Sequence, residues 1–180
     1  SSDYPQNSSD PNNRWYNTSY PGYGVSNPAT HSSCKDLPNA NEMSWYCMYG
    51  DPRWDGDELW TTMGHLYKGG MWFKKKSQIS GYNSNTAYDG TDWRTTNKSK
   101  NWSFSQTLPS AADANKYFYL PALGYYTSGR LMNLGGAGHY WSSSAITWSS
   151  GYAVSMYFRS GYVIVNSSSR NVGFWAGGFE

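Results

Sequence analysis

YAVSMYFRSGYVIVN, residues 152–166, decides the fold of this 180-residue chain. From residue 152 to 159 apolar and polar side chains alternate with the period of a β-strand, which sorts them into two sets: Tyr152, Val154, Met156, Phe158 and Ala153, Ser155, Tyr157, Arg159. Ser160-Gly161 has the composition of a tight hairpin turn, and residues 162–166 alternate again. The stretch predicts an antiparallel hairpin with one face in the core and one face outside.

Further strands are predicted on both sides of this hairpin. Residues 140–145 (YWSSSA) indicate a strand or turn, and a polar turn at 167–169 leads to a final strand near 173–179. Earlier in the chain, residues 71–73 (MWF) and 117–123 (YFYLPAL) are typical of short strands, the second of them buried. The C-terminal part is therefore predicted to be an antiparallel sheet.

Helices are predicted only near the start of the domain. Asn39 and Glu42 have the spacing of a capping box, apolar residues follow at helical spacing, and Gly50 closes a helix over residues 40–49. A second helix is expected from about Asp57, because acids occupy its first turn, Trp60, Met63 and Tyr67 form one stripe, and Gly69-Gly70 follows. Two helices followed by an antiparallel sheet indicate an α+β fold.

The chain divides into an arm and one domain. Residues 1–33 are rich in Ser, Asn, Pro, Gly and Tyr without a helical or strand period, which predicts an irregular arm or linker. Residues 34–180 have a suitable length for a single domain. Within it, residues 80–105 form a long polar connection of the kind that has a role in binding or packing. Because the sequence starts with Ser, we expect it to be a mature or excised part of a longer protein.

Charge and composition exclude several classes of partner. The net charge is +2 and the one basic run, residues 74–76, is short, so a nucleic-acid partner is not expected. No apolar run reaches the roughly 20 residues of a membrane span. The two cysteines, Cys34 and Cys47, do not have the spacing of a zinc site; they form either a disulfide or two buried thiols.

Catalytic chemistry is not indicated. The three histidines, His31, His65 and His139, lie in the arm, the expected second helix and the C-terminal third, without a nucleophile motif beside them. The carboxylates between residues 51 and 58 lack the alternating pattern of a calcium loop. We therefore predict neither an enzyme, nor a metal site, nor a cofactor.

The last third of the chain has the composition of a binding surface. From Leu131 to Glu180 the charged side chains are Arg159, Arg170 and Glu180, and the rest is dominated by Ser, Gly, Tyr, Trp and Asn. Antibody paratopes use the same residues, since Tyr and Trp give rigid contact area while Ser and Asn give adaptable hydrogen bonds. The alternative interpretation is a Ser- and Gly-rich sheet whose aromatic residues only pack the core.

Two blocks of sequence carry a family resemblance. Residues 37–46 (LPNANEMSWY) and residues 138–145 (GHYWSSSA), the latter followed by the hairpin and by Gly173-Phe174, resemble the variable proteins of diversity-generating retroelements, as found in gut Bacteroidales and their phages. These proteins are related in kind to the phage major tropism determinant. The resemblance implies a C-type-lectin-like fold, close to that of formylglycine-generating enzymes. It also implies a display role, in which adenine-directed mutagenesis rewrites codons in a variable region at about residues 136–175.

The resemblance further implies which residues contact a ligand. Residues that an altered Asn codon can encode are His139, Ile146, Thr147, Ser150, Tyr152, Tyr157, Arg159, Tyr162, Ile164, Asn166, Ser168 and Asn171. Trp148 and Trp175 are also assigned to the ligand-binding set, although they would need an altered Arg codon or else are fixed. Trp141 and Phe174 are expected to stay constant between sibling copies. The calcium-binding motifs of lectins (Glu-Pro-Asn, Gln-Pro-Asp, Trp-Asn-Asp) are absent from the sequence.

The resulting expectation is a non-catalytic display domain, outside the cell on a cell surface or a virion, that binds a protein or glycan on another cell. Three alternatives stay open. They are a structural cell-surface or pilin-tip module, a carbohydrate-binding module with Trp and Tyr as stacking platforms, and an enzyme of the formylglycine-generating type.

Overall fold

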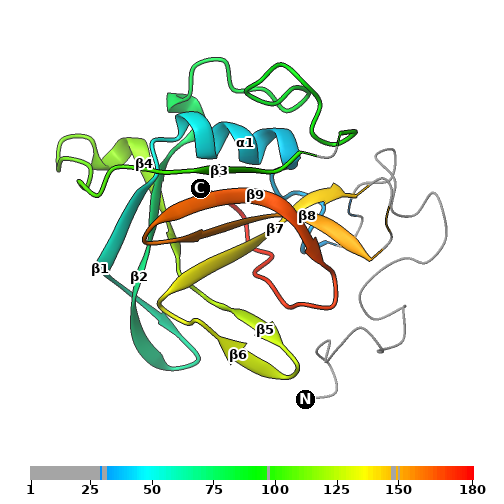
Figure 1. Cartoon of the computed structure of the whole chain (residues 1–180). Coiled ribbons are helices and arrows are strands. Elements are labelled where there is room, and N and C mark those ends of the chain that lie inside the picture. The colour runs from blue at the N-terminus through cyan, green and yellow to red at the C-terminus, as the bar shows by residue number, and fades with distance from the viewer. Residues whose placement is uncertain (1–28, 30–31, 97, 147–148, 150) are drawn as a thin grey trace.

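The computed structural model describes Ala29, residues 32–96, 98–146, Ser149 and 151–180. These residues form an α+β fold with one α-helix and three antiparallel sheets (Figure 1). The elements in chain order are α1 (Ala40–Tyr49), β1 (Arg53–Thr62), β2 (His65–Lys74), η2 (Lys76–Gln78), β3 (Lys100–Trp102), η3 (Ala114–Lys116), β4 (Tyr117–Pro121), β5 (Tyr125–Thr127), β6 (Arg130–Met132), β7 (Ala137–Ala145), β8 (Tyr152–Arg159) and β9 (Tyr162–Ser169). The sheets have the strand orders β1-β2-β4, β3-β9-β8-β7 and β5-β6.

Helix α1 begins and ends where the sequence predicts. The Glu42 backbone N–H donates to Asn39 Oδ1 at 3.0 Å, and the Asn39 N–H donates to Glu42 Oε2 at 2.8 Å, which completes the capping box. At the other end the Gly50 N–H donates to the Tyr46 carbonyl. The helix buries Met43, Tyr46 and Cys47 against the sheets. No helix among the described residues has the length and apolarity to cross a membrane.

The second predicted helix is wrong: its residues form the hairpin of β1 and β2. Trp60 and Tyr67 are seven residues apart, a spacing that fits one helical stripe, but here they are cross-strand partners with ring centroids 5.3 Å apart. Met63 (φ 50°) and Gly64 (φ 77°) are both left-handed, as a two-residue turn between antiparallel strands requires.

The acids that indicated a helix start shape a bulge in β1 instead. Asp55 Oδ1 accepts the backbone N–H groups of Asp57 and Glu58, both at 3.0 Å, where the register of β1 against β2 shifts. The other carboxylate oxygen accepts the Trp72 indole N–H at 3.0 Å. Gly70 lies within β2, where a side chain would collide with the Leu120 carbonyl and the Tyr119 ring.

The predicted hairpin of residues 152–166 is confirmed as β8 and β9. Its inward side chains, Met156, Phe158, Val163 and Val165, are buried and pack on Tyr140 of β7 and on α1. Strand β9 continues to Ser169, so the turn predicted at 167–169 is wrong; Ser167–Ser169 pair with Tyr152–Val154 of β8. The final strand predicted near 173–179 is wrong. Two isolated β-bridges are found there instead, between Gly173 and Tyr126 and between Trp175 and Tyr140.

The two blocks that carry the family resemblance meet in space. The Ser143 N–H donates to the Pro38 carbonyl at 3.0 Å, and the Ala40 N–H donates to Ser144 Oγ at 2.9 Å. Ser142 Oγ donates to the Val154 carbonyl at 2.7 Å across the register shift between β7 and β8. The buried serines of β7 therefore hold the start of α1 against this sheet.

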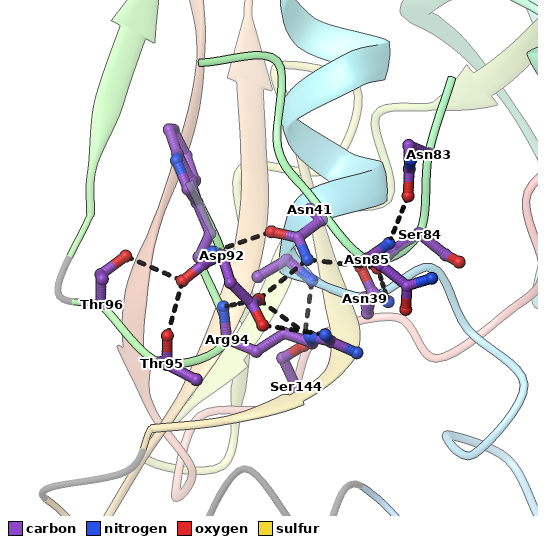
Figure 2. A network of polar contacts seen from close by, with 12 residues as sticks. Asn39, Asn41, Asn83, Ser84, Asn85, Asp92, Arg94, Thr95, Thr96 and Ser144 are labelled. Carbon is purple, nitrogen blue, oxygen red and sulfur yellow. Dashed lines mark hydrogen bonds and ion pairs between the residues drawn. The ribbon is translucent and has the colours of Figure 1, made fainter. Parts of the chain in front are cut away.

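The long polar connection after β2 is fastened to α1 through Asn41, whose side chain is fully buried (Figure 2). The Asn41 amide donates to the Ser84 carbonyl at 3.1 Å and to Asp92 Oδ1 at 2.9 Å, and its Oδ1 accepts the Trp93 N–H at 2.7 Å. Arg94 donates to both carboxylate oxygens of Asp92, at 2.9 and 2.8 Å. These hydrogen bonds lower the pKa of Asp92 to about 2. The connection thus has a packing role, and Trp93 and Trp102 fill the space beneath it.

The two cysteines are separate free thiols. Cys47 is buried in α1, and burial raises the pKa of its thiol well above the ordinary range; Cys34 is partly exposed. Of the two alternatives that the sequence leaves open, the disulfide is not formed, and only one of the thiols is buried.

Candidate recognition face

The side of the β3-β9-β8-β7 sheet that faces away from the core collects most of the described residues predicted to bind a ligand. Strand register sets this arrangement, because directly opposed residues share a face. His139 opposes Tyr157, Tyr157 opposes Ile164, and Arg159 opposes Tyr162. We call this surface the recognition face and define it by His139, Trp141, Ser155, Tyr157, Arg159, Tyr162, Ile164, Asn166 and Ser168.

The centre of the recognition face is a cluster of aromatic rings. The His139 imidazole is stacked on the Tyr157 ring, with centroids 4.3 Å apart and planes 25° apart. Two further rings contact His139, Tyr125 at 4.6 Å and Phe174 at 4.8 Å. Phe174 also contacts the Trp141 ring at 4.5 Å. The ring faces are therefore largely covered by other rings.

His139 acts as a spacer within this cluster. Its Nε2 is buried and has no hydrogen-bond partner among the described residues. Burial lowers the pKa of the imidazole from 6.5 to about 4, so the ring is neutral at physiological pH. His139 packs between Tyr157, Tyr125 and Phe174, and so restricts the positions open to the Tyr157 ring.

Tyr157, Tyr162 and Arg159 form the exposed end of the face. The Arg159 guanidinium lies 5.1 Å from the Tyr162 ring centroid, a cation–π contact. The Tyr162 hydroxyl donates to the Tyr157 hydroxyl at 3.4 Å. Burial and this hydrogen bond raise the pKa of Tyr157 to about 12. Both tyrosines are half-buried and Arg159 is exposed, so the three side chains are held in place while still reaching solvent.

The opposite end of the face is polar. Ser155, which is fully buried, donates from Oγ to Asn166 Oδ1 at 3.3 Å. Its Oγ also lies 2.8 Å from Ser168 Oγ. Asn166 and Ser168 are half-buried and offer adaptable donors and acceptors beside the rings.

The remaining predicted residues lie elsewhere. Tyr152, 46% exposed, begins β8 on the strand side that it shares with Val154, and so lies outside the recognition face. Trp175 is 51% exposed and bridges Tyr140 of β7, and half-buried Asn171 accepts a hydrogen bond from Ser169 Oγ. Ile146 is only 5% exposed, and its apolar side chain packs in the hydrophobic core. The structure therefore does not support it as a contact residue. Thr147, Trp148 and Ser150 lie outside the described residues.

Within the recognition face, Trp141 and Ser155 were not predicted to bind a ligand, and sequence reasoning also missed two residues that border the face. Asn101 of β3 opposes Ile164, and Tyr125 of β5 covers His139. Both come from distant short strands whose register no local pattern reveals. For Tyr125, the available signal was the aromatic pair at 125–126 just before the predicted variable region.

The described residues do not gather into a group of three or more His, Cys, Asp or Glu that could hold a metal ion. The recognition face combines rings, hydroxyls, amides and a guanidinium, which are groups common in protein interfaces. No protein-family model, curated protein or solved structure matches this chain.

Proposed function

We propose that this chain is a C-type-lectin-like display domain whose region 136–175 is diversified by a retroelement. It binds a protein or glycan on another cell, without catalysis or cofactor, from a cell surface or a virion. One helix against antiparallel sheets is compatible with this fold, and the contact between the residue 37–46 and 138–145 blocks supports the resemblance on which the proposal depends.

One observation carries the proposal. Residues predicted from sequence to be variable, on three different strands, lie together on one side of one sheet, while Met156, Phe158, Val163 and Val165 between them are buried. A strand that alternates between core and contact residues can change its outer side chains and keep its inner ones. This division between scaffold and surface is what a diversified binding protein needs.

The mechanism is preorganised recognition. His139, Phe174 and Trp141 fix the positions of Tyr157 and its neighbours before the ligand arrives, so little side-chain entropy is lost on binding. Asn166 and Ser168 then adjust their hydrogen bonds to the ligand.

Sibling copies of the gene provide the test. We expect their differences to fall at outward positions of β8 and β9, such as Tyr157, Tyr162 and Ile164, and to spare the inward neighbours Met156 and Val163. Trp141 and Phe174 should also be constant. Differences spread equally over outward and inward positions would contradict diversification.

A second candidate function is aromatic-platform carbohydrate binding. The exposed indole of Trp175 and ring of Tyr152 favour it, since exposed rings stack on sugars. Neutral oligosaccharides on a glycan array distinguish the two: binding that Trp175→Ala abolishes and Tyr157→Ala leaves unchanged would support the carbohydrate-binding module.

A further inference from the structure

The part of the sequence that forms the recognition face carries only positive charges. Between Asp113 and Glu180 the sequence contains no Asp or Glu, while it contains Lys116, Arg130, Arg159 and Arg170. Two of these, Arg159 and Arg170, belong to the β8–β9 hairpin or directly follow it. Ordinary protein surfaces intersperse both signs, so a wholly cationic surface favours an anionic partner.

Both arginines lack a carboxylate partner within the described part of the chain. Arg159 is exposed and is oriented by its contact with Tyr162. Arg170 is half-buried, and its Nε donates to the Tyr152 carbonyl at 2.8 Å. Burial lowers the pKa of Arg170. No ion pair found among the described residues involves either guanidinium.

The two guanidinium groups lie at opposite ends of β8. Arg170 is anchored to Tyr152, the first residue of the strand, and Arg159 is the last. The two ends of this strand are seven residue steps of about 3.3 Å, or roughly 23 Å, apart. This distance matches the width of a protein–protein contact better than that of a small anion, since a standard interface buries about 800 Å² on each partner.

The ring geometry argues against a sugar at the centre of the face. A sugar stacks on the flat side of an aromatic ring, but the His139 and Tyr157 rings face each other, and Phe174 covers Trp141. The Tyr162 ring is likewise covered by Arg159. The rings are half-buried, and the Tyr157 and Tyr162 hydroxyls lie beside them, a combination that suits the mixed side chains of a protein.

We propose that the partner of the recognition face is an acidic protein surface, whose carboxylates pair with Arg159 and Arg170 at the two ends of β8. This inference rests on the proposed function, because it names the class of ligand for the same face. Each planar guanidinium can bind a carboxylate through two N–H groups, and the rings between them supply the apolar contact.

The test uses the whole chain, immobilised, and a library of random peptides of about 15 residues, long enough to reach both arginines. We expect the selected peptides to be enriched in Asp and Glu, with acidic positions about seven residues apart. Arg159→Gln and Arg170→Gln should each weaken their binding about tenfold. Arg130→Gln, an exposed arginine of β6, should leave binding unchanged, and Arg170→Lys should restore part of the loss. Thermal unfolding of each variant confirms that it is folded.

Three outcomes would overturn the inference. In the first outcome, the selected peptides lack acidic residues, or they bind both Arg→Gln variants normally but do not bind Tyr157→Ala. The recognition face would then be supported, and the acidic partner would be contradicted. If heparin binds through the two arginines and no peptide is selected, the partner is an anionic glycan. If neither peptides nor glycans bind, the proposed function fails as well.

Discussion

At the scale of single residues, two buried polar side chains have opposite roles. Asn41 satisfies its donors and its acceptor and thereby holds a loop of about twenty residues against α1. His139 leaves Nε2 without a partner in the described structure and fills space between rings. The first side chain contributes to stability through hydrogen bonds, whereas the second keeps the recognition face in place and imposes a pH-dependent cost.

Replacing Asn41 should destabilise the domain strongly. Asn41→Ala leaves the Trp93 N–H without its acceptor in a buried site and removes one partner of Asp92, which should cost about 2–4 kcal/mol. Chemical denaturation measures the loss. The matched control is Asn115→Ala on exposed η3, which should change the free energy of unfolding by less than about 0.5 kcal/mol. Equal effects of the two substitutions would refute the role given to Asn41.

His139 should make the fold sensitive to mild acid. Its pKa is about 4 in the folded chain against 6.5 in the unfolded one, so between these values only the unfolded state takes up the proton. The free energy of unfolding should therefore fall by about 2.5 kcal/mol as the pH decreases from 6.5 to 4.

The variant His139→Phe should remove this part of the pH dependence, while His65→Phe, at an exposed position of β2, should keep it. Unfolding curves at several pH values report the difference. A His139→Phe variant that loses as much stability as the parent chain over this range would contradict the assignment.

At the scale of elements, patterns confined to neighbouring residues predicted structure well. The capping box at Asn39 and Glu42 gives α1, and the alternation of residues 152–159 gives β8. The segment from Asp57 failed because a spacing of seven between Trp60 and Tyr67 fits both a helical stripe and a cross-strand pair. The recognition face was predicted in its β8 and β9 parts and at His139 of β7. Asn101 of β3, which borders the face, was not predicted, because the pairing of β3 with β9 joins residues some sixty positions apart.

The bulge in β1 gives a test of this corrected element. Asp55→Ala should cost about 2–4 kcal/mol, because three N–H groups lose their acceptor. Asp57→Ala removes only an exposed ion pair with Lys68 and should cost less than about 1 kcal/mol. A helix beginning near Asp57 would instead make Asp57 the more important acid. Equilibrium unfolding of both variants decides between the two structures.

At the scale of the whole molecule, single strands place buried side chains on one side and half-buried or exposed side chains on the other. Helix α1, the Ser142–Ser144 bulge and the inward side chains of β8 and β9 form one packed unit. The outward side chains of the same strands contact one another, but little of the core depends on them. The central claim is that the outward side of this sheet can change while the fold persists.

Protease resistance of two displayed libraries tests this claim most directly. One library randomises the outward positions Tyr157, Arg159, Tyr162, Ile164 and Asn166; the other randomises the inward neighbours Met156, Phe158, Val163 and Val165. We predict that most members of the outward library stay folded and resist protease, whereas nearly all members of the inward library are cleaved. Equal loss of resistance in the two libraries would contradict the division between scaffold and recognition face.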